Sequence, residues 1–317
     1  MLEVRNLKTY FYTLKGVVRA VDDVSFELKR GEGLGIAGES GCGKSTLAYS
    51  LIRLVPPPGK IVEGEIIFKG RDVTKLSEEE FRKEVRWKGI SMVFQGAMNA
   101  LNPVYTIGDQ IAEVLMLHQG YTKKEALETA GKLLQMVGID PKRVRSYPHE
   151  LSGGMKQRVV IAMALALNPP VVIADEPTTA LDVVVQAQIL NLMKRLKEEL
   201  GISVILISHD LSVIAELADK IAIMYGGKIV EYGSSEAIYN NPLHPYTQAL
   251  LGSIPRLKGE IKDLTWIPGQ PPDLVKPPPG CRFAPRCRFA MEKCSQEPPM
   301  IEVEPGHKVA CWLYAQK

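Results

Sequence analysis

The segment GESGCGKST at residues 38–46 constrains the fold of this chain more than any other part of the sequence. It has the spacing G-x4-G-K-[ST], follows the apolar run GLGIA, and opens the segment KSTLAYSLIRLV, which has the pattern of a helix. A strand, a glycine-rich turn and a helix in this order form a phosphate-binding loop, whose backbone N–H groups and helix N-terminus surround an anionic phosphate. The sequence therefore predicts an α/β nucleotide-binding fold.

The positions of this loop have distinct expected roles. Lys44 is expected to reach the β- and γ-phosphates of a nucleotide, and Ser45 to hold Mg²⁺. Cys42 occupies a variable position of the loop and is interpreted as a small filler, not a ligand. The other residues of the loop that are expected to bind the nucleotide are Gly38, Ser40, Gly41, Gly43 and Thr46.

Polar residues follow three further apolar runs that are expected to be buried strands. VVIAD ends in Asp175 and precedes Glu176, SVILIS precedes His209, and ISMVF precedes Gln95. Because open α/β sheets bind ligands at the carboxyl ends of their strands, these side chains are expected at one crevice. Asp175 suits Mg²⁺, and Glu176 would orient and polarise an attacking water. His209 would contact the γ-phosphate, whereas Gln95 could touch Mg²⁺ or the water, although a surface glutamine would look the same.

The segment LSGGMKQR at residues 151–158 predicts a second phosphate-binding helix end. Ser152 can cap a helix that begins through Gly153 and Gly154, which leaves backbone N–H groups exposed. One chain has one phosphate loop, so this helix end need not reach its own nucleotide. Two chains that face each other head to tail could complete each other's sites.

The pattern along the chain divides it into regions. Residues from about 96 to 167 have helical spacing, including TKKEALETAGKLLQMVG, and we expect an inserted helical subdomain there. The segment IAIMYGGKIVEYG predicts a hairpin at its Gly-Gly turn. The expected domains are therefore a nucleotide-binding domain at residues 1–233 and a Pro-rich domain with four cysteines at residues 234–317, joined by stiff segments.

Composition excludes some classes of function. The chain is 45% hydrophobic and 24% charged, as is ordinary for a globular protein, and no run approaches the roughly 18 apolar residues of a membrane helix. The N-terminus MLEVRNLKTY lacks a signal-peptide core, so we expect a cytosolic protein whose membrane role depends on partners. A net charge of +3 does not indicate a nucleic-acid partner.

Taken together, these motifs resemble the nucleotide-binding subunit of an ABC transporter. The phosphate loop, Gln95, LSGGM, VVIADEP, ALD and His209 occur in that family's order over roughly residues 1–233. The resemblance implies a P-loop NTPase core with an antiparallel β subdomain, an inserted helical subdomain and a small C-terminal appendage with cysteines. It also implies ATP hydrolysis at two composite sites. Ser152, Gly153 and Gly154 of one chain would meet the γ-phosphate held by the other, and Asp182 would connect the two sites.

The C-terminal region narrows this resemblance. NPLHPYTQALLGSIPR at residues 241–256 and GCRFAPRC with AMEKC resemble the oligopeptide and dipeptide importer subfamily, as does YPHELSGGMKQRV. The implied partners are two membrane subunits, a second ATPase that is a paralogue or a second copy, and an external solute-binding protein, at the cytoplasmic face of the membrane. Some relatives carry oligosaccharides, which is one alternative. A soluble ABC ATPase that acts on DNA or ribosomes is the other.

Three departures from the family pattern bear on the site. Met155 stands where the signature motif commonly has Gln, and GAMNALNP follows Gln95 where many relatives have Asp-Pro, a position expected to affect coupling to the membrane subunit. The aromatic residue that stacks on adenine is not fixed by spacing. Resemblance to F-x-T segments favours Phe11 or Tyr12, and either could instead be a core aromatic.

Four clustered cysteines are the last feature: Cys281, Cys287, Cys294 and Cys311, with the spacing C-x5-C-x6-C-x16-C. A cytosolic location disfavours disulfides, and the spacing matches neither zinc fingers nor ferredoxins, so zinc, an iron–sulfur cluster and free thiols all remain open. Members of the resembling subfamily carry a [4Fe–4S] cluster on these cysteines, which ranks that cluster first, zinc second and free thiols third. Either metal centre is expected to hold the Pro-rich loops together.

Overall fold

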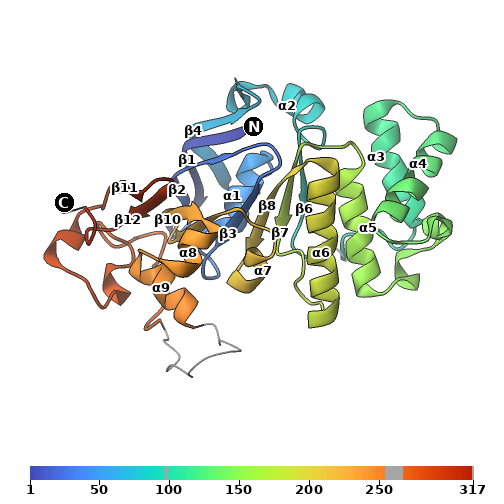
Figure 1. The fold of residues 1–317 in the computed structure, drawn as a ribbon. Helices are drawn as coiled ribbons and strands as arrows, with labels where there is room; N and C mark the ends of the chain where they lie inside the picture. The colour runs from blue at the N-terminus through green and yellow to red at the C-terminus, as the bar shows by residue number, and fades with distance from the viewer. Residues whose placement is uncertain (97–98, 254–266, 316–317) are drawn as a thin grey trace. The chain divides into compact units, whose positions relative to one another are not determined.

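The computed structural model describes residues 1–96, 99–253 and 267–315 (Figure 1). The chain forms two compact units. Unit 1 comprises Met1–Leu28, Gly33–Asp72 and Ile207–Lys317, and unit 2 comprises Lys29–Glu32 and Val73–Leu206. Ala97 and Met98 of the GAMNALNP segment, and residues 254–256 of the segment at 241–256, lie outside the described residues.

Unit 1 contains an antiparallel sheet in the order β2-β1-β4-β5. Its strands are β1 (Leu2–Thr13), β2 (Gly16–Leu28), β4 (Gly59–Phe68) and β5 (Arg71–Asp72). Strand β1 lies between β2 and β4, and the register pairs Leu2 with Leu28 on one side and with Phe68 on the other. Leu2, Val4 and Leu7 are fully buried, so this sheet has an apolar face that packs into the core of unit 1.

Unit 1 also contains five neighbouring strands in the order β11-β12-β10-β9-β3. These are β3 (Gly33–Ala37), β9 (Lys220–Tyr225), β10 (Lys228–Ser234), β11 (Met300–Glu304) and β12 (His307–Ala310). Strand β3 pairs with β9 in parallel, and every residue of β3 is buried. Strands β9 and β10 form the predicted hairpin around the Gly226–Gly227 turn.

The helices of unit 1 are short. They are α1 (Lys44–Leu51), α7 (Leu211–Ala215), α8 (Ser235–Asn240) and α9 (Pro245–Gly252), with 3-10 turns at Ala284–Arg286 and Glu292–Ser295. Helix α9 begins with Pro at its first position and His244 as N-cap, whose ring Nδ1 accepts a hydrogen bond from the backbone of Tyr246 at 3.0 Å.

Unit 2 contains three neighbouring strands in the order β8-β7-β6. They are β6 (Ile90–Val93), β7 (Val171–Asp175) and β8 (Ser203–Ser208), of which the last two residues of β8 belong to unit 1. All three strands are buried at every position, as their continuous apolar sequences predict. The helices are α2 (Glu78–Glu84), α3 (Ile107–Gln119), α4 (Lys123–Met136), α5 (Gly153–Leu165) and α6 (Val183–Leu200), with 3-10 turns at Val73–Lys75, Pro141–Arg145 and Pro148–Glu150.

Local capping explains where these helices begin and end. The helix predicted in TKKEALETAGKLLQMVG is α4, and Thr122 caps it in a capping box with Glu125. Helix α3 starts after Thr106, whose hydroxyl accepts a hydrogen bond from the backbone N–H of Asp109, and ends at Gly120, which has a left-handed backbone conformation. Within the described ranges, no helix has both the length and the apolar character that crossing a bilayer requires.

The C-terminal residues belong to the same compact unit as the phosphate loop. Strand β12 extends the sheet edge at β10, where Glu231 pairs with Val309. The fully buried Glu231 carboxylate contacts His307 Nε2 at 2.8 Å and accepts hydrogen bonds from the backbone of Leu243 and His244. The compact units therefore follow a different division from the sequence domains expected at residues 1–233 and 234–317, and that division stays a prediction.

A cluster of aromatic side chains also attaches residues near Phe283 to the rest of unit 1. The Phe283 side chain is 3% exposed, and its ring centroid lies 5.2 Å from that of Tyr225 and 5.3 Å from that of Tyr246. The ring of His244 lies 5.8 Å away on the same cluster. Aromatic pairs at these distances stabilise a fold beyond the apolar area that they bury.

We predict that Phe283→Ala lowers the free energy of unfolding by about 3–5 kcal/mol, because it leaves a cavity among buried aromatic rings. Phe289→Ala is the matched control, since Phe289 is 43% exposed and its loss should change stability by less than about 0.5 kcal/mol. Thermal unfolding of the purified variants measures both effects. Equal shifts for the two variants would show that residues 280–290 unfold without loss of the core.

Candidate nucleotide-binding site

The phosphate loop lies in unit 1 between β3 and α1, as predicted. Gly38, Gly41 and Gly43 have φ values of +153°, +78° and +104°. A Cβ atom on Gly43 would lie 2.0 Å from the carbonyl oxygen of Ala20, and one on Gly38 would lie 2.2 Å from that of Met224. Both positions therefore need glycine for backbone conformation and for space.

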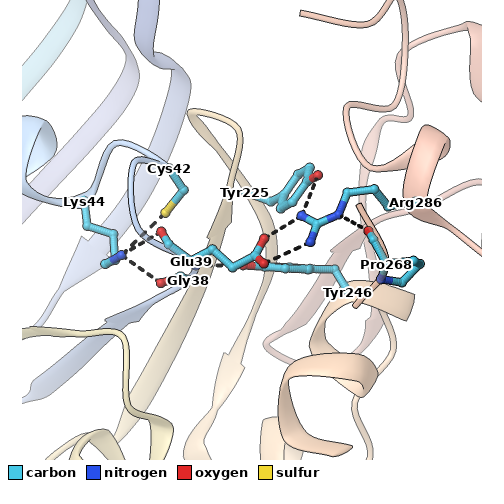
Figure 2. Close-up of polar contacts among 8 residues, drawn as sticks. All are labelled: Gly38, Glu39, Cys42, Lys44, Tyr225, Tyr246, Pro268 and Arg286. Carbon is cyan, nitrogen blue, oxygen red and sulfur yellow. Dashed lines mark hydrogen bonds and ion pairs between the residues drawn. The ribbon is translucent and has the colours of Figure 1, made fainter. Parts of the chain in front are cut away.

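Lys44 begins α1 and is only 6% exposed. Its Nζ donates hydrogen bonds to the carbonyl oxygens of Gly38 at 2.7 Å and Glu39 at 3.0 Å (Figure 2). The buried Cys42 thiol lies 3.7 Å from the same nitrogen, and burial raises the pKa of this thiol. The ammonium group thus lies over the loop, and the protonated Cys42 side chain fills the space beside it.

Two residues far along the chain hold the phosphate loop, and sequence reasoning missed both. The backbone N–H of Glu39 donates to the Tyr246 hydroxyl at 2.8 Å, and the Glu39 carboxylate accepts two hydrogen bonds from Arg286 (Figure 2). No local pattern signals either contact, because more than 200 residues separate the partners. Of the loop residues with hydroxyl groups, Ser45 and Thr46 are half-buried in the first turn of α1, and Ser40 is exposed.

The candidate adenine-stacking residues lie side by side on β1. Tyr12 is 49% exposed. Phe11 is partly buried, and a Cβ atom on Gly59 of β4 would lie 2.6 Å from its ring, so Phe11 packs against that strand. Tyr12 therefore has the more accessible ring, and the choice between the two stays a prediction. His209 also lies in unit 1; it follows β8 and is exposed.

In unit 2, the structure brings Gln95 and Glu176 together. Gln95 follows β6, and its Nε2 donates to Glu176 Oε2 at 3.2 Å. The Thr179 hydroxyl donates to the same oxygen at 3.0 Å. Glu176 has a φ of +46°, a left-handed conformation that side chains other than glycine seldom adopt. Asp175, the residue before it, ends β7 and is fully buried.

The start of α5 has the predicted cap. The Ser152 hydroxyl accepts a hydrogen bond from the backbone N–H of Met155 at 3.4 Å, and Ser152 and Gly153 are exposed. In α6, Asp182 is the N-cap and accepts from Val185 N–H at 2.9 Å. A Cβ atom on Gly154 would lie 2.6 Å from the Val185 side chain, so the two helix starts pack closely and Gly154 must be small.

The expected site residues fall in both units. Those in unit 1 are Phe11, Tyr12, Gly38, Ser40, Gly41, Gly43, Lys44, Ser45, Thr46 and His209. Those in unit 2 are Gln95, Ser152, Gly153, Gly154, Asp175, Glu176 and Asp182.

The four clustered cysteines all lie in unit 1 and form no disulfide. Cys281, Cys287, Cys294 and Cys311 line one cavity of about 10 Å³. Burial, and after it the neighbouring thiols, raises the pKa of Cys281, Cys287 and Cys311, the last to about 11. Among the described residues, no group of three or more His, Cys, Asp or Glu side chains is placed to hold a metal ion.

Two family models match the chain. The ABC transporter model matches residues 21–179, and the model for the oligopeptide/dipeptide transporter C-terminal region matches residues 230–294. The dipeptide transport ATP-binding protein DppD of Bacillus subtilis is 50% identical over 321 residues, which cover 100% of this chain and 96% of that protein. The chain belongs to the ATP-binding subunits of ABC transporters.

Other ABC proteins agree with this assignment. The oligopeptide transport ATP-binding protein OppD of Escherichia coli is 48% identical, with 98% of this chain and 93% of that protein covered. A solved dimeric ATP-binding cassette in a post-hydrolysis state with ADP and Pi has 31% identity and a TM-score of 0.66, and it covers 74% of this chain and 99% of its own. These matches confirm the predicted ABC ATPase fold and the ATP-hydrolysing family.

Proposed function

We propose that this ABC subunit hydrolyses ATP to drive the import of oligopeptides or dipeptides through partner membrane subunits. The observation that carries the proposal is the extent of the similarity. Relatives named for dipeptide and oligopeptide transport match it over nearly the whole chain, and the matched C-terminal region is named for the same transporters. The alternatives of oligosaccharide transport and of action on DNA or ribosomes have no support of this kind.

The nucleotide site is proposed as follows. Lys44 binds the β- and γ-phosphates of ATP, and the glycine-rich backbone of residues 38–43 donates N–H groups to them. Tyr12 or Phe11 stacks on the adenine. Ser45, Asp175 and Gln95 would hold Mg²⁺, which neutralises charge on the phosphates when bound. Hydroxyl, carboxylate and amide oxygens are the donors that this cation prefers.

Hydrolysis is assigned to Glu176, with Gln95 and His209 in supporting roles. Glu176 orients the attacking water toward the γ-phosphorus and accepts a proton from that water. The hydrogen bonds from Gln95 and Thr179 to its carboxylate fix the side chain in place. His209 stabilises charge that develops on the γ-phosphate. The left-handed backbone at Glu176 supports this assignment, because such conformations cluster at functional sites.

The exposed start of α5 supports a composite site in a dimer. Ser152, Gly153 and Gly154 would bind the γ-phosphate held by a second ATPase, either a paralogue or a second copy of this chain. Asp182, which caps the helix packed against Gly154, would link the two sites. ATP binding then closes the pair and hydrolysis reopens it, which would move the two membrane subunits at the cytoplasmic face. An external solute-binding protein would deliver the solute.

We propose further that the four cysteines hold a [4Fe–4S] cluster, with zinc as the alternative. The four thiols line one cavity, which supplies the right number and type of donors. Burial raises the pKa of Cys281, Cys287 and Cys311, so these three are protonated without a metal, and metal binding would release protons and draw the sulfurs together. The role would be structural, because a metal centre can tie loops that have little apolar core of their own.

We predict that Glu176→Gln reduces ATP hydrolysis by about 10²- to 10⁴-fold, the usual contribution of a general base. ATP binding should persist, because the amide keeps the size of the side chain and removes a negative charge near the phosphates. Glu198→Gln, at an exposed position of α6, is the matched control and should keep wild-type turnover. Steady-state hydrolysis and binding of a fluorescent ATP analogue measure the two properties. Near-normal hydrolysis by Glu176→Gln would refute its assigned role.

The transport proposal is tested in the assembled complex. Proteoliposomes that contain this subunit, its membrane partners and the external binding protein should hydrolyse ATP faster, and accumulate labelled solute, when given di- or oligopeptides. The Glu176→Gln complex is the negative control for energy coupling. Stimulation by oligosaccharides and not by peptides would overturn the proposed substrate class.

Metal content tests the cysteine proposal. Anaerobically purified protein should contain about four irons and four acid-labile sulfides per chain. The Cys294→Ser and Cys311→Ser variants should lose iron, whereas Cys42→Ser should retain it, since Cys42 lies in the phosphate loop. Stoichiometric zinc in place of iron would mean that the site is a structural zinc site. Protein without metal would contradict both the cluster and the zinc proposal.

A further inference from the structure

The loop at residues 281–287, here called the cysteine loop, carries two arginines that are buried against other parts of unit 1. The Arg286 side chain is 6% exposed and Arg282 is 7% exposed. Arginine is seldom buried without a partner, because a buried charge needs a counter-charge and hydrogen bonds. The partners of these two residues show what the cysteine loop holds in place.

Arg286 forms a forked pair with Glu39 of the phosphate loop (Figure 2). Its Nη1 donates to Glu39 Oε2 at 2.6 Å and its Nη2 donates to Oε1 at 3.0 Å. The same guanidinium donates to the Tyr225 hydroxyl at 3.2 Å and to the carbonyl oxygen of Pro268 at 2.7 Å. A two-point pair of this kind fixes the direction of the carboxylate as well as its distance. The Glu39 side chain therefore has one preferred orientation.

Glu39 is in turn linked to the groups that bind phosphate. Its backbone N–H donates to Tyr246, and its carbonyl oxygen accepts hydrogen bonds from Lys44 Nζ at 3.0 Å and from the backbone N–H of Cys42 at 3.3 Å. The side chain, amide and carbonyl of this one residue are thus each held by a different partner. A change in the Glu39 side chain would be passed directly to the loop backbone.

Arg282 reaches the same loop by a second route. It donates to the carboxylate of Asp22 and to the carbonyl oxygen of Gly226. Gly226 belongs to the hairpin turn whose next residue, Gly227, donates its N–H to Cys42 O at 2.9 Å. Asp22 also accepts a hydrogen bond from the Tyr10 hydroxyl at 2.6 Å, next to the candidate adenine-stacking residues on β1.

We propose that Arg286 is a positioning residue for ATP binding: by fixing and neutralising Glu39, it sets the conformation of the phosphate loop from the cysteine loop. Two physical effects act together. The forked pair pre-organises a glycine-rich loop that would otherwise lose conformational entropy when it orders around phosphate. It also neutralises a carboxylate that would repel the negatively charged triphosphate. The inference rests on the proposed ATP-binding role of the phosphate loop.

The test compares ATP binding and hydrolysis by full-length variants. Arg286→Met should weaken binding of a fluorescent ATP analogue, and raise the KM for ATP, by about 2- to 30-fold, which corresponds to the range of about 0.5–2 kcal/mol for residues that act through others. At saturating ATP, kcat should stay within about twofold, because Arg286 does not touch the reacting groups. Arg286→Lys keeps the charge and should recover part of the affinity.

The matched control is Arg288→Met, which removes an exposed arginine two residues along the same chain segment. It should bind ATP like the wild type. A double variant separates the proposed effect from misfolding: when Glu39→Gln is added to Arg286→Met, the unneutralised carboxylate is removed, and part of the lost affinity should return. If Arg286 only attached the cysteine loop to the rest of unit 1, Glu39→Gln would not restore the ATP affinity that Arg286→Met loses. Thermal unfolding of each variant confirms that it is folded.

The possible outcomes separate this inference from the proposed function. If the wild type and Arg286→Met bind ATP equally well, or if Arg286→Met and Arg288→Met weaken binding by the same factor, Arg286 has no positioning role although the ATPase assignment stands. If adding Glu39→Gln to Arg286→Met weakens ATP binding further, Arg286 does not act through Glu39. If the wild type itself does not bind ATP, the proposed function fails first.

Discussion

The phosphate loop is built on close contacts between its backbone and the backbone of two other segments of unit 1. Gly38 lies against Met224 at the end of β9, and Gly43 lies against Ala20 of β2, each at a separation that excludes a Cβ atom. Loop amides can converge on a phosphate only if the backbone takes left-handed conformations at these points. The site in unit 1 therefore depends on the antiparallel sheet and on the β9–β10 hairpin as much as on the loop itself.

The C-terminal region completes this arrangement in unit 1. Strand β12 extends the sheet at the edge of β10. The buried Glu231 of β10 contacts His307 of β12 and accepts a hydrogen bond from the backbone at the start of α9. Helix α9 in turn brings Tyr246 to the amide of Glu39. The cysteine loop adds Arg286 on the other side of the same residue. The polar contacts at Glu231 and Glu39 and the buried side chains of Tyr246, Phe283 and Val309 together hold this region in place.

The sequence predicts the parts of the site that depend on local patterns. The phosphate loop, the buried strands that precede Gln95, Glu176 and His209, the Ser152 cap and the Gly-Gly hairpin all follow from residues close together in the chain. The same reasoning could not find the pairing of β12 with β10 or the contact between Glu39 and Arg286. Those contacts join positions tens to hundreds of residues apart, and any exposed glutamate or arginine would look the same in the sequence. The left-handed backbone of Glu176 is likewise a product of tertiary packing, since glutamate has no preference for it.

The C-terminal region belongs to the same compact unit as the phosphate loop and holds that loop through Tyr246 and Arg286. Amide hydrogen exchange of residues 38–47 in the full-length protein without nucleotide tests this most directly, because it reports the loop's own protection. Exchange should be faster in Arg286→Met than in the wild type, and unchanged in Arg288→Met. Identical exchange in all three proteins would mean that Arg286 does not hold the loop, and would contradict the role assigned to it.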